Sequence, residues 1–231
     1  MSSWSAIDFT ALWLTLKVAC WATALALAFG VAAGYAMAHL RLPGRRLIEA
    51  MLLLPMVLPP TVLGYYLIVL LGRRSAIGQW LGETFGLHLL FTWQGAVVAA
   101  AVVAFPFVFA TARAAFDGVD RQLEGAARVL GANEWEVFVR VTLPLAARGI
   151  AAGAMLAFAR AMGEFGATLI IAGNIPGETQ TLSLAVYDAV QSGNDALANA
   201  LVAVISVVCV VVLVVSGSLL RSGAARSWYP R

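Results

Sequence analysis

Charged residues are scarce in this chain. Only 12% of its 231 residues are charged, 61% are hydrophobic, and the mean hydropathy is +0.88. Soluble domains carry roughly 25% charged residues, so this composition excludes an ordinary soluble protein. It predicts a small polytopic membrane protein.

Lysine is nearly absent, since Lys17 is the only one. A P-loop needs the pattern GxxxxGK[S/T], so the chain cannot form one, and any ATP hydrolysis must come from another subunit. HExxH, CxxC and a credible Ser-His-Asp set within the apolar stretches are missing too. Cys20 and Cys209 lie in apolar runs, which argues against a disulfide or metal site. We therefore expect no catalytic residue, metal or cofactor in this chain, although an intramembrane enzyme remains an alternative.

Long apolar stretches, in contrast, are plentiful. About 30 Å of hydrocarbon requires roughly 20 helical residues, and backbone groups in lipid must be bonded within the helix. The N-terminus lacks a basic region and the run after it is too long for a signal peptide, so the first stretch is predicted to be retained. We predict one all-α membrane domain, residues 1–231, with five spans at approximately 11–38, 49–71, 89–115, 145–172 and 196–220.

The arginines are distributed unevenly between the loops. With the N-terminus outside, eleven arginines fall on inner segments and only Arg73 and Arg74 on outer ones. Cytoplasmic loops are enriched in basic residues, so the N-terminus is predicted outside and the C-terminus in the cytoplasm. The inner arginines are Arg41, Arg45, Arg46, Arg113, Arg121, Arg128, Arg140, Arg148, Arg221, Arg226 and Arg231.

The first two spans carry signals for packing and for helix breaks. Gly30 and Gly34 form a GxxxG pattern, which suits close helix contact. Pro55, Pro59 and Pro60 each remove a helical hydrogen bond, and the freed carbonyls cannot face lipid. The second span is therefore predicted to line a protein interior or a wet cavity, as interrupted helices do in transporters, with a static kink as the alternative.

In the fourth span, polar residues recur at helical spacing. Arg160 falls near the middle of the hydrocarbon, and Glu164 and Thr168 follow at intervals of four, which would stack them on one face of a continuous helix. Gly149, Gly153 and Ala157 extend that face with small residues. The polar face either lines a pathway or forms a buried ion pair that fixes helix packing.

The longest polar interruption, Leu123–Pro144, predicts two short helices joined at a corner. Gly131 suits a left-handed helix stop, and Asn133 with Glu136 has capping-box spacing. The predicted apolar faces are Phe116, Val119, Leu123, Ala126, Ala127 and Leu130 in the first helix, and Trp135, Phe138, Val141 and Leu145 in the second.

The loop 173–195 contains no lysine or arginine, as expected of an outer surface. Leu182, Ala185, Val186 and Ala189 keep helical spacing and predict a short amphipathic helix. The loop is a candidate docking site for an external partner, and an ordinary loop is the alternative.

The polar interruption also resembles a known motif. Its sequence is similar to the EAA loop of ABC-importer permeases. The matching residues are Ala126-Ala127, then Gly131 after three residues, and Val141-Thr142-Leu143-Pro144 after nine more. Gly125 stands where that motif has glutamate, and Glu124 comes one place earlier. The resemblance implies that segment 116–148 docks into a cytoplasmic ATPase subunit, the alternative being a solvated hairpin. The implied coupling residues are Glu124, Ala126, Ala127, Gly131, Asn133, Glu134, Trp135, Leu143 and Pro144.

Further blocks, Leu54–Pro60, Gly72–Gly78 and Phe158–Thr181, resemble molybdate ABC-transporter permeases, although the last is shared with sulfate permeases. Pathway candidates are Pro59, Pro60, Thr61, Arg160, Gly163, Glu164, Gly166 and Thr168, and docking candidates are Asn174, Pro176 and Gly177.

The resemblance implies a type I importer in a bacterial inner membrane. Two copies of the chain, two ATPase subunits holding ATP and Mg, and a periplasmic oxyanion-binding protein would assemble among membrane lipids, without nucleic acid. The implied substrate is molybdate, with tungstate possible; sulfate or thiosulfate import and a passive anion channel are the alternatives.

Overall fold

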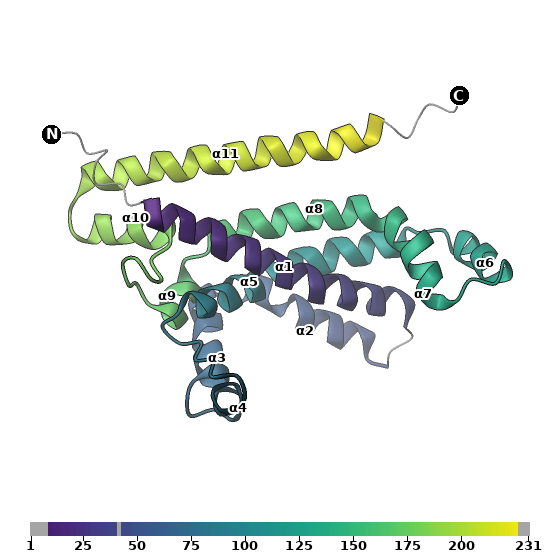
Figure 1. Cartoon of the computed structure of the whole chain (residues 1–231), viewed down its shortest axis with the longest axis horizontal. Coiled ribbons are helices and arrows are strands. Elements are labelled where there is room, and N and C mark those ends of the chain that lie inside the picture. The colour runs from purple at the N-terminus through teal and green to yellow at the C-terminus, as the bar shows by residue number, and fades with distance from the viewer. Residues whose placement is uncertain (1–8, 41–42, 226–231) are drawn as a thin grey trace.

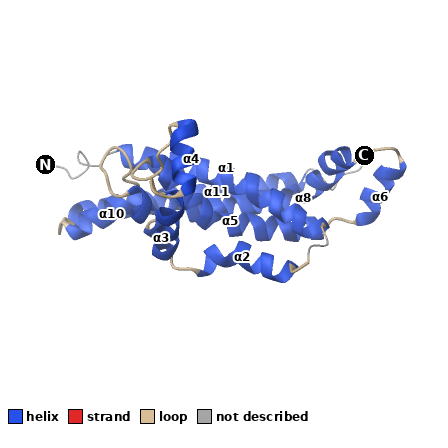
Figure 2. Cartoon of the chain, turned by 90° about the horizontal axis from the view of Figure 1, so that it is seen from below, coloured by secondary structure: helices blue, strands red, loops and turns tan. Residues whose placement is uncertain are grey.

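The chain folds as a bundle of helices. The computed structural model describes residues 9–40 and 43–225, and helices α1 (Phe9–His39), α5 (Trp93–Asp117), α8 (Leu143–Met162) and α11 (Asp195–Ala225) run along its long axis (Figure 1). The described residues contain no strand (Figure 2). Four helices in this part of the chain are long and apolar enough to span a membrane, or five spans if one bent pair counts as one. The all-α membrane fold is confirmed.

Small residues bring α1 and α5 close together. A Cβ built on Gly30 would lie 2.9 Å from the Cβ of Val108, and one on Gly34 would lie 2.9 Å from the backbone nitrogen of Arg113. Contacts this short exclude any side chain, so the GxxxG pattern is confirmed as a packing contact. Fully buried alanines of both helices, including Ala22 and Ala100, fill the rest of this core.

The second predicted span is two helices rather than one. Helix α2 (Arg45–Val57) and helix α3 (Pro60–Leu71) are bent by 113° at the break between them. Pro60 begins α3, where its missing N–H would have no helical partner anyway, whereas Pro55 lies inside α2 without ending it. The span predicted over 49–71 is broken at its prolines, as their number led us to expect, and α3 runs steeply away from the long axis of the bundle (Figure 1).

Beyond α3 lies a helix that the sequence analysis missed, α4 (Ala76–Phe85). Ser75 caps its first turn by accepting a hydrogen bond from the Gly78 N–H at 2.9 Å, and Gly86 ends it in the left-handed conformation. A serine before the helix and a glycine after it are recognised boundary signals, so both were available in the sequence.

The fourth predicted span is also interrupted. Helix α8 ends at Met162, and a separate helix, α9 (Gly166–Ala172), begins after three residues. Arg160, Glu164 and Thr168 therefore do not share one continuous helix, which corrects the predicted stack. The small face packs against α5, since a Cβ on Gly153 would lie 1.9 Å from the Thr111 Oγ1.

Helix α10 (Leu182–Gln191) confirms the amphipathic helix predicted after residue 173. Leu182 and Ala189 are buried and pack with Ala198 and Leu201 of α11. The N–H of Leu182 donates to the Thr15 Oγ1 at 2.8 Å, which fixes α10 to α1.

Different short helices lie at the two ends of the bundle (Figure 1). Helices α6 (Arg121–Val129) and α7 (Glu134–Val137) lie at one end, and α3, α4, α9 and α10 lie toward the other. The segments predicted to be cytoplasmic thus gather at the α6–α7 end. Arg41, Arg226 and Arg231 of the arginine count lie outside the described residues.

Candidate functional site: a polar hairpin and two helix breaks

The corner between α6 and α7 is built on one glycine. Gly131 has a φ of +91°, and its N–H donates to the Arg128 carbonyl at 3.0 Å, while Ala132 N–H donates to the Ala127 carbonyl at 3.1 Å. A residue with a Cβ rarely adopts this backbone conformation. The glycine corner predicted from the sequence is confirmed.

Asn133 starts α7 with a complete capping box. Its Oδ1 accepts from the Glu136 N–H at 3.0 Å, and its own N–H donates to the Glu136 Oε2 at 3.0 Å. Two otherwise unbonded donors are satisfied, so α7 leaves the corner in a defined direction.

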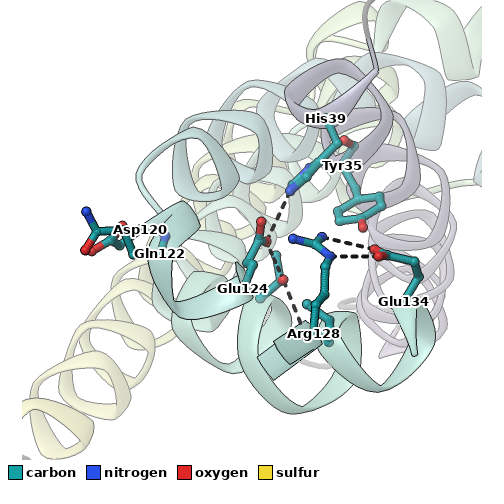
Figure 3. Close-up of polar contacts among 9 residues, drawn as sticks. Tyr35, His39, Asp120, Gln122, Glu124, Arg128 and Glu134 are labelled. Carbon is teal, nitrogen blue, oxygen red and sulfur yellow. Dashed lines mark hydrogen bonds and ion pairs between the residues drawn. The ribbon is translucent and has the colours of Figure 1, made fainter. Parts of the chain in front are cut away.

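Arg128 and Glu134 join the two sides of the corner. The Arg128 Nε donates to Glu134 Oε1 at 2.7 Å and its second nitrogen donates to Oε2 at 3.0 Å, a two-point contact visible in Figure 3. The hydrogen bond to Glu134 raises the pKa of Arg128, so the guanidinium stays charged. Because both side chains are largely exposed, we assign the pair a geometric rather than a strongly stabilising role.

The hairpin presents apolar side chains outward. Val129 is 88% exposed, Leu130 87% and Trp135 71%, and Leu123 and Ala126 are also exposed. The apolar faces predicted from the sequence therefore point outward at Leu123, Leu130 and Trp135. Helix α5 stops at Asp117, and α6 restarts with Asp120 capping the Gln122 N–H at 2.8 Å, so the periodicity does not continue between them.

Glu124, the acid that stands one place before the motif's usual glutamate, points inward. It is 4% exposed, and its Oε1 accepts from the Thr142 hydroxyl at 2.6 Å and lies 3.2 Å from the His39 Nε2 (Figure 3). A Cβ on Gly125, the place where the motif has glutamate, would meet nothing within 4 Å. One residue turns a helix by about 100°, so the shifted acid faces the protein instead of the open side.

Leu143 and Pro144 lie where the hairpin joins the membrane span. A π-helical turn, Phe138–Thr142, links α7 to α8, and the Leu143 N–H donates to the Phe138 carbonyl. Pro144 lies in the first turn of α8, directly after the wider π-helical turn. The helical hydrogen bond that proline cannot donate is therefore lost where the hydrogen-bond pattern already changes. Helix runs without a break from Glu134 to Met162, a length of 29 residues.

The two helix breaks meet at one place in the bundle. A Cβ on Gly166 would lie 3.0 Å from the Pro60 Cβ and 3.4 Å from the Thr61 nitrogen. Gly64 is equally close to α9, since its Cβ would lie 2.7 Å from the Ile170 Cβ. The structure thus brings together Pro60, Thr61 and Gly166, which were separate pathway candidates in the sequence.

Beside this junction Arg160 and Glu164 form an ion pair. An Arg160 guanidinium nitrogen lies 2.8 Å from Glu164 Oε2, and Glu164 Oε1 accepts from the Ala167 N–H at 2.8 Å. The Glu164 side chain is 2% exposed and that of Arg160 30%. The ion pair is one of the two alternatives that the sequence offered, whereas the capping of α9 by Glu164 was not foreseen.

Thr168 and Gly163 complete the junction. Thr168 is 1% exposed, and its Oγ1 has no hydrogen-bond partner within the described part of the chain. Gly163 follows the last residue of α8 and is exposed. Thr168 is thus a buried hydroxyl whose hydrogen-bond partner the described residues do not supply.

At the opposite end from the hairpin, the loop after α9 holds the docking candidates. Pro176 and Gly177 are exposed, Gly177 with a φ of +79°, and Asn174 is half-buried. A cavity of about 380 Å³ opens beside Gly177 and is lined by Trp13, Lys17 and Trp93 among others. The Lys17 ammonium lies 3.5 Å from the centre of the Trp93 ring, a cation–π contact that the sequence analysis missed.

Comparison with known proteins decides the family. The profile described as "Binding-protein-dependent transport system inner membrane component" matches residues 26–226. The chain belongs to this permease family. Its polytopic, helical architecture is that of an inner-membrane component, as the resemblance implied.

Curated relatives of this permease include molybdenum and sulfate permeases. The chain is 43% identical over 221 residues to the "Molybdenum transport system permease protein ModB" of Escherichia coli (strain K12), covering 95% of the chain and 96% of the relative. ModB of Haemophilus influenzae is 44% identical over 186 residues, covering 80% and 81%. The "Sulfate transport system permease protein CysT" of Escherichia coli (strain K12) is 36% identical over 177 residues, covering 77% and 64%.

Solved structures show the same fold at low identity. The permease resembles a chain of the inward-facing MetNI methionine ABC transporter with a TM-score of 0.71 at 19% identity, covering 92% and 94%. A chain of the bacterial alginate ABC transporter, solved with an alginate pentasaccharide-bound periplasmic protein, gives 0.73 at 18%, covering 93% and 78%. The predicted ABC-importer permease fold is confirmed.

Proposed function

We propose that this permease is the membrane subunit of an ATP-driven molybdate importer that also accepts tungstate. The observation that supports molybdate as the substrate is the 43% sequence identity to a molybdenum permease across 95% of the chain. The identity to a sulfate permease is 36%, across 77% of the chain. Molybdate, tungstate and sulfate are all tetrahedral dianions, so sulfate or thiosulfate is the competitor that the experiment must separate.

Energy would come from two cytoplasmic ATPase subunits that hold ATP and Mg. The permease has no P-loop of its own, and the α6–α7 hairpin offers an exposed apolar surface around a rigid corner. In this proposal the ATPase contacts the exposed side chains of Ala126, Val129, Leu130 and Trp135. The direction of α7 is set by Gly131 and Asn133. The hairpin therefore lies in the cytoplasm, with the N-terminus outside and the C-terminus inside.

The pathway would run along the junction of the two breaks, between two copies of the permease. Helix α3 leaves large apolar side chains uncovered, among them Tyr65 at 62% exposure and Tyr66 at 51%. In the proposed homodimer a second copy of the permease would cover them. Helix α3 also begins at the junction beside Arg160 and Thr168, and a helix N-terminus favours negative charge. A dianion would pass these groups without a deep binding site.

A periplasmic binding protein would deliver the oxyanion to the other end. The exposed Pro176–Gly177 turn lies there, in a loop without a basic residue. The alginate importer named above was solved with a periplasmic protein, which supports this kind of partner for an importer of the same fold.

Reconstitution with the ATPase and the binding protein in liposomes tests the proposal. We expect molybdate-loaded binding protein to raise ATP hydrolysis and to drive molybdate uptake, with tungstate competing and sulfate competing poorly. Uptake that continues without the ATPase would show a passive channel. Preferential sulfate uptake would reassign the substrate, and turnover of a lipid or peptide would indicate an enzyme instead.

A further inference from the structure

We propose that Glu124 is a positioning residue that ties helix α6 to α1 through His39, and that this attachment depends on one titratable proton. The inference rests on the coupling role proposed above for the α6–α7 hairpin. It assigns Glu124 to the inside of the hairpin rather than to the ATPase surface.

Glu124 is the only buried residue of α6. All other side chains of this helix are exposed or half-buried, so α6 has little apolar packing to hold it against the bundle. Through Glu124, however, α6 reaches two other elements: His39 at the end of α1 and Thr142 in the π turn that leads into α8. Movement of α6 would therefore reach α1 and α8 through one carboxylate.

The hydrogen-bond directions fix the number of protons at this site. The His39 Nδ1 lies 3.1 Å from the Tyr35 carbonyl, which can only accept, so Nδ1 carries a proton. The contact between Nε2 and Glu124 at 3.2 Å then needs a second proton, either on the imidazole or on the carboxyl group. Because Oε1 already accepts from Thr142, an imidazolium donating to a carboxylate satisfies every partner.

Loss of that second proton would place a bare ring nitrogen against a carboxylate. The attachment should therefore hold at lower pH and weaken as the pH rises. The charged and titratable groups around His39 are Tyr35 on its own helix, Glu124 and Arg128 on α6, and Glu134 on α7. The Tyr35 ring stacks on the His39 ring, and Phe116 of α5 meets the His39 ring edge-on.

Glu124→Gln is the variant that separates position from protonation. Both contacts of Glu124 are made by Oε1, and an NH₂ group in that place can donate one hydrogen to a neutral His39 and the other to the Thr142 hydroxyl. The hydroxyl can then donate to the Val137 carbonyl, 3.5 Å away, so both contacts survive without a titratable proton. Glu124→Ala removes both contacts. Gln122→Ala, an exposed change on the same helix, is the matched control.

The first measurement is molybdate transported per ATP by the reconstituted importer between about pH 6 and about pH 8, where histidine titrates. We expect Glu124→Ala to lower this ratio at least about tenfold while ATP hydrolysis continues, as loss of a charged hydrogen bond allows. The parent protein should lose coupling as the pH rises, and Glu124→Gln should keep its coupling at all pH values. Full coupling in Glu124→Ala, or identical pH profiles of the parent and Glu124→Gln, would overturn the inference.

The second measurement needs no substrate and so separates this inference from the proposed function. Hydrogen exchange of α6 amides in the purified permease–ATPase complex should quicken with rising pH, beyond the intrinsic pH dependence of exchange, in the parent but not in Glu124→Gln. No transport of molybdate by the parent would overturn the proposed function alone. Unchanged α6 protection in Glu124→Ala would overturn the positioning role.

Discussion

Arg160 and Glu164 are joined by a 2.8 Å ion pair across the end of a helix. Arg160 belongs to α8, whereas Glu164 lies in the break and caps α9 through the Ala167 N–H. The pair therefore fixes the angle between two helices, in addition to neutralising two charges.

Removing one partner of this pair should harm folding more than removing both. Arg160→Met leaves the buried Glu164 carboxylate unpaired, a loss of about 3–5 kcal/mol. The double variant Arg160→Met with Glu164→Gln leaves no charge, and its amide oxygen can still cap α9. We expect the double variant to recover most of the purified yield and of the oxyanion uptake. A well-folded double variant without uptake would instead place Arg160 in the pathway.

Gly131→Val should uncouple ATP hydrolysis from transport while the protein still inserts. Nothing lies within 4 Å of a Cβ at this position, so the whole effect comes from the φ of +91°. A left-handed backbone costs a residue with a Cβ about 1 kcal/mol, and a β-branched one more. Gly125→Ala, which also has open space and keeps helical φ, is the control and should transport normally. Normal uptake by Gly131→Val would show that the corner is not needed in this form.

Gly64→Ala should destabilise the junction of the two breaks. Its Cβ would lie 2.7 Å from the Ile170 Cβ, and overpacking of this kind costs about 1–3 kcal/mol. Gly118→Ala makes the same chemical change where the Cβ has only ordinary contacts, at 3.5 Å and beyond. Thermal unfolding in detergent should separate the two variants, and equal melting temperatures would contradict the close packing of α3 on α9.

The orientation of the chain is open to a direct test by cysteine labelling. After replacement of Cys20 and Cys209 by alanine, Ser192→Cys should react with an impermeant reagent in intact cells, and Ser222→Cys should not. The reason is the excess of arginine on the segments at the hairpin end. Labelling only at position 222 would reverse the topology.

Local chemistry made some features predictable and others not. Gly131 and the Asn133–Glu136 box were readable because each depends on residues within one turn. The break after Met162 was not foreseen, although Gly163, Glu164 and Gly166 interrupt the apolar run there, because glycine is common in membrane helices and the packing of Gly166 on Pro60 is a tertiary contact. The inward turn of Glu124 was missed because its partner His39 lies 85 residues away in the sequence.

The unbroken helix from Glu134 to Met162 has the geometry of a rigid rod that joins the hairpin to the helix break. Its 29 residues span about 43 Å at 1.5 Å per residue. If this rod tilted about its midpoint by about 5°, each end would move by about 2 Å, in opposite directions. A displacement of the helix end at Trp135 would thus produce a displacement of the same size and opposite direction at Gly163. The helix break at Gly163 is therefore where the movement would reach α9.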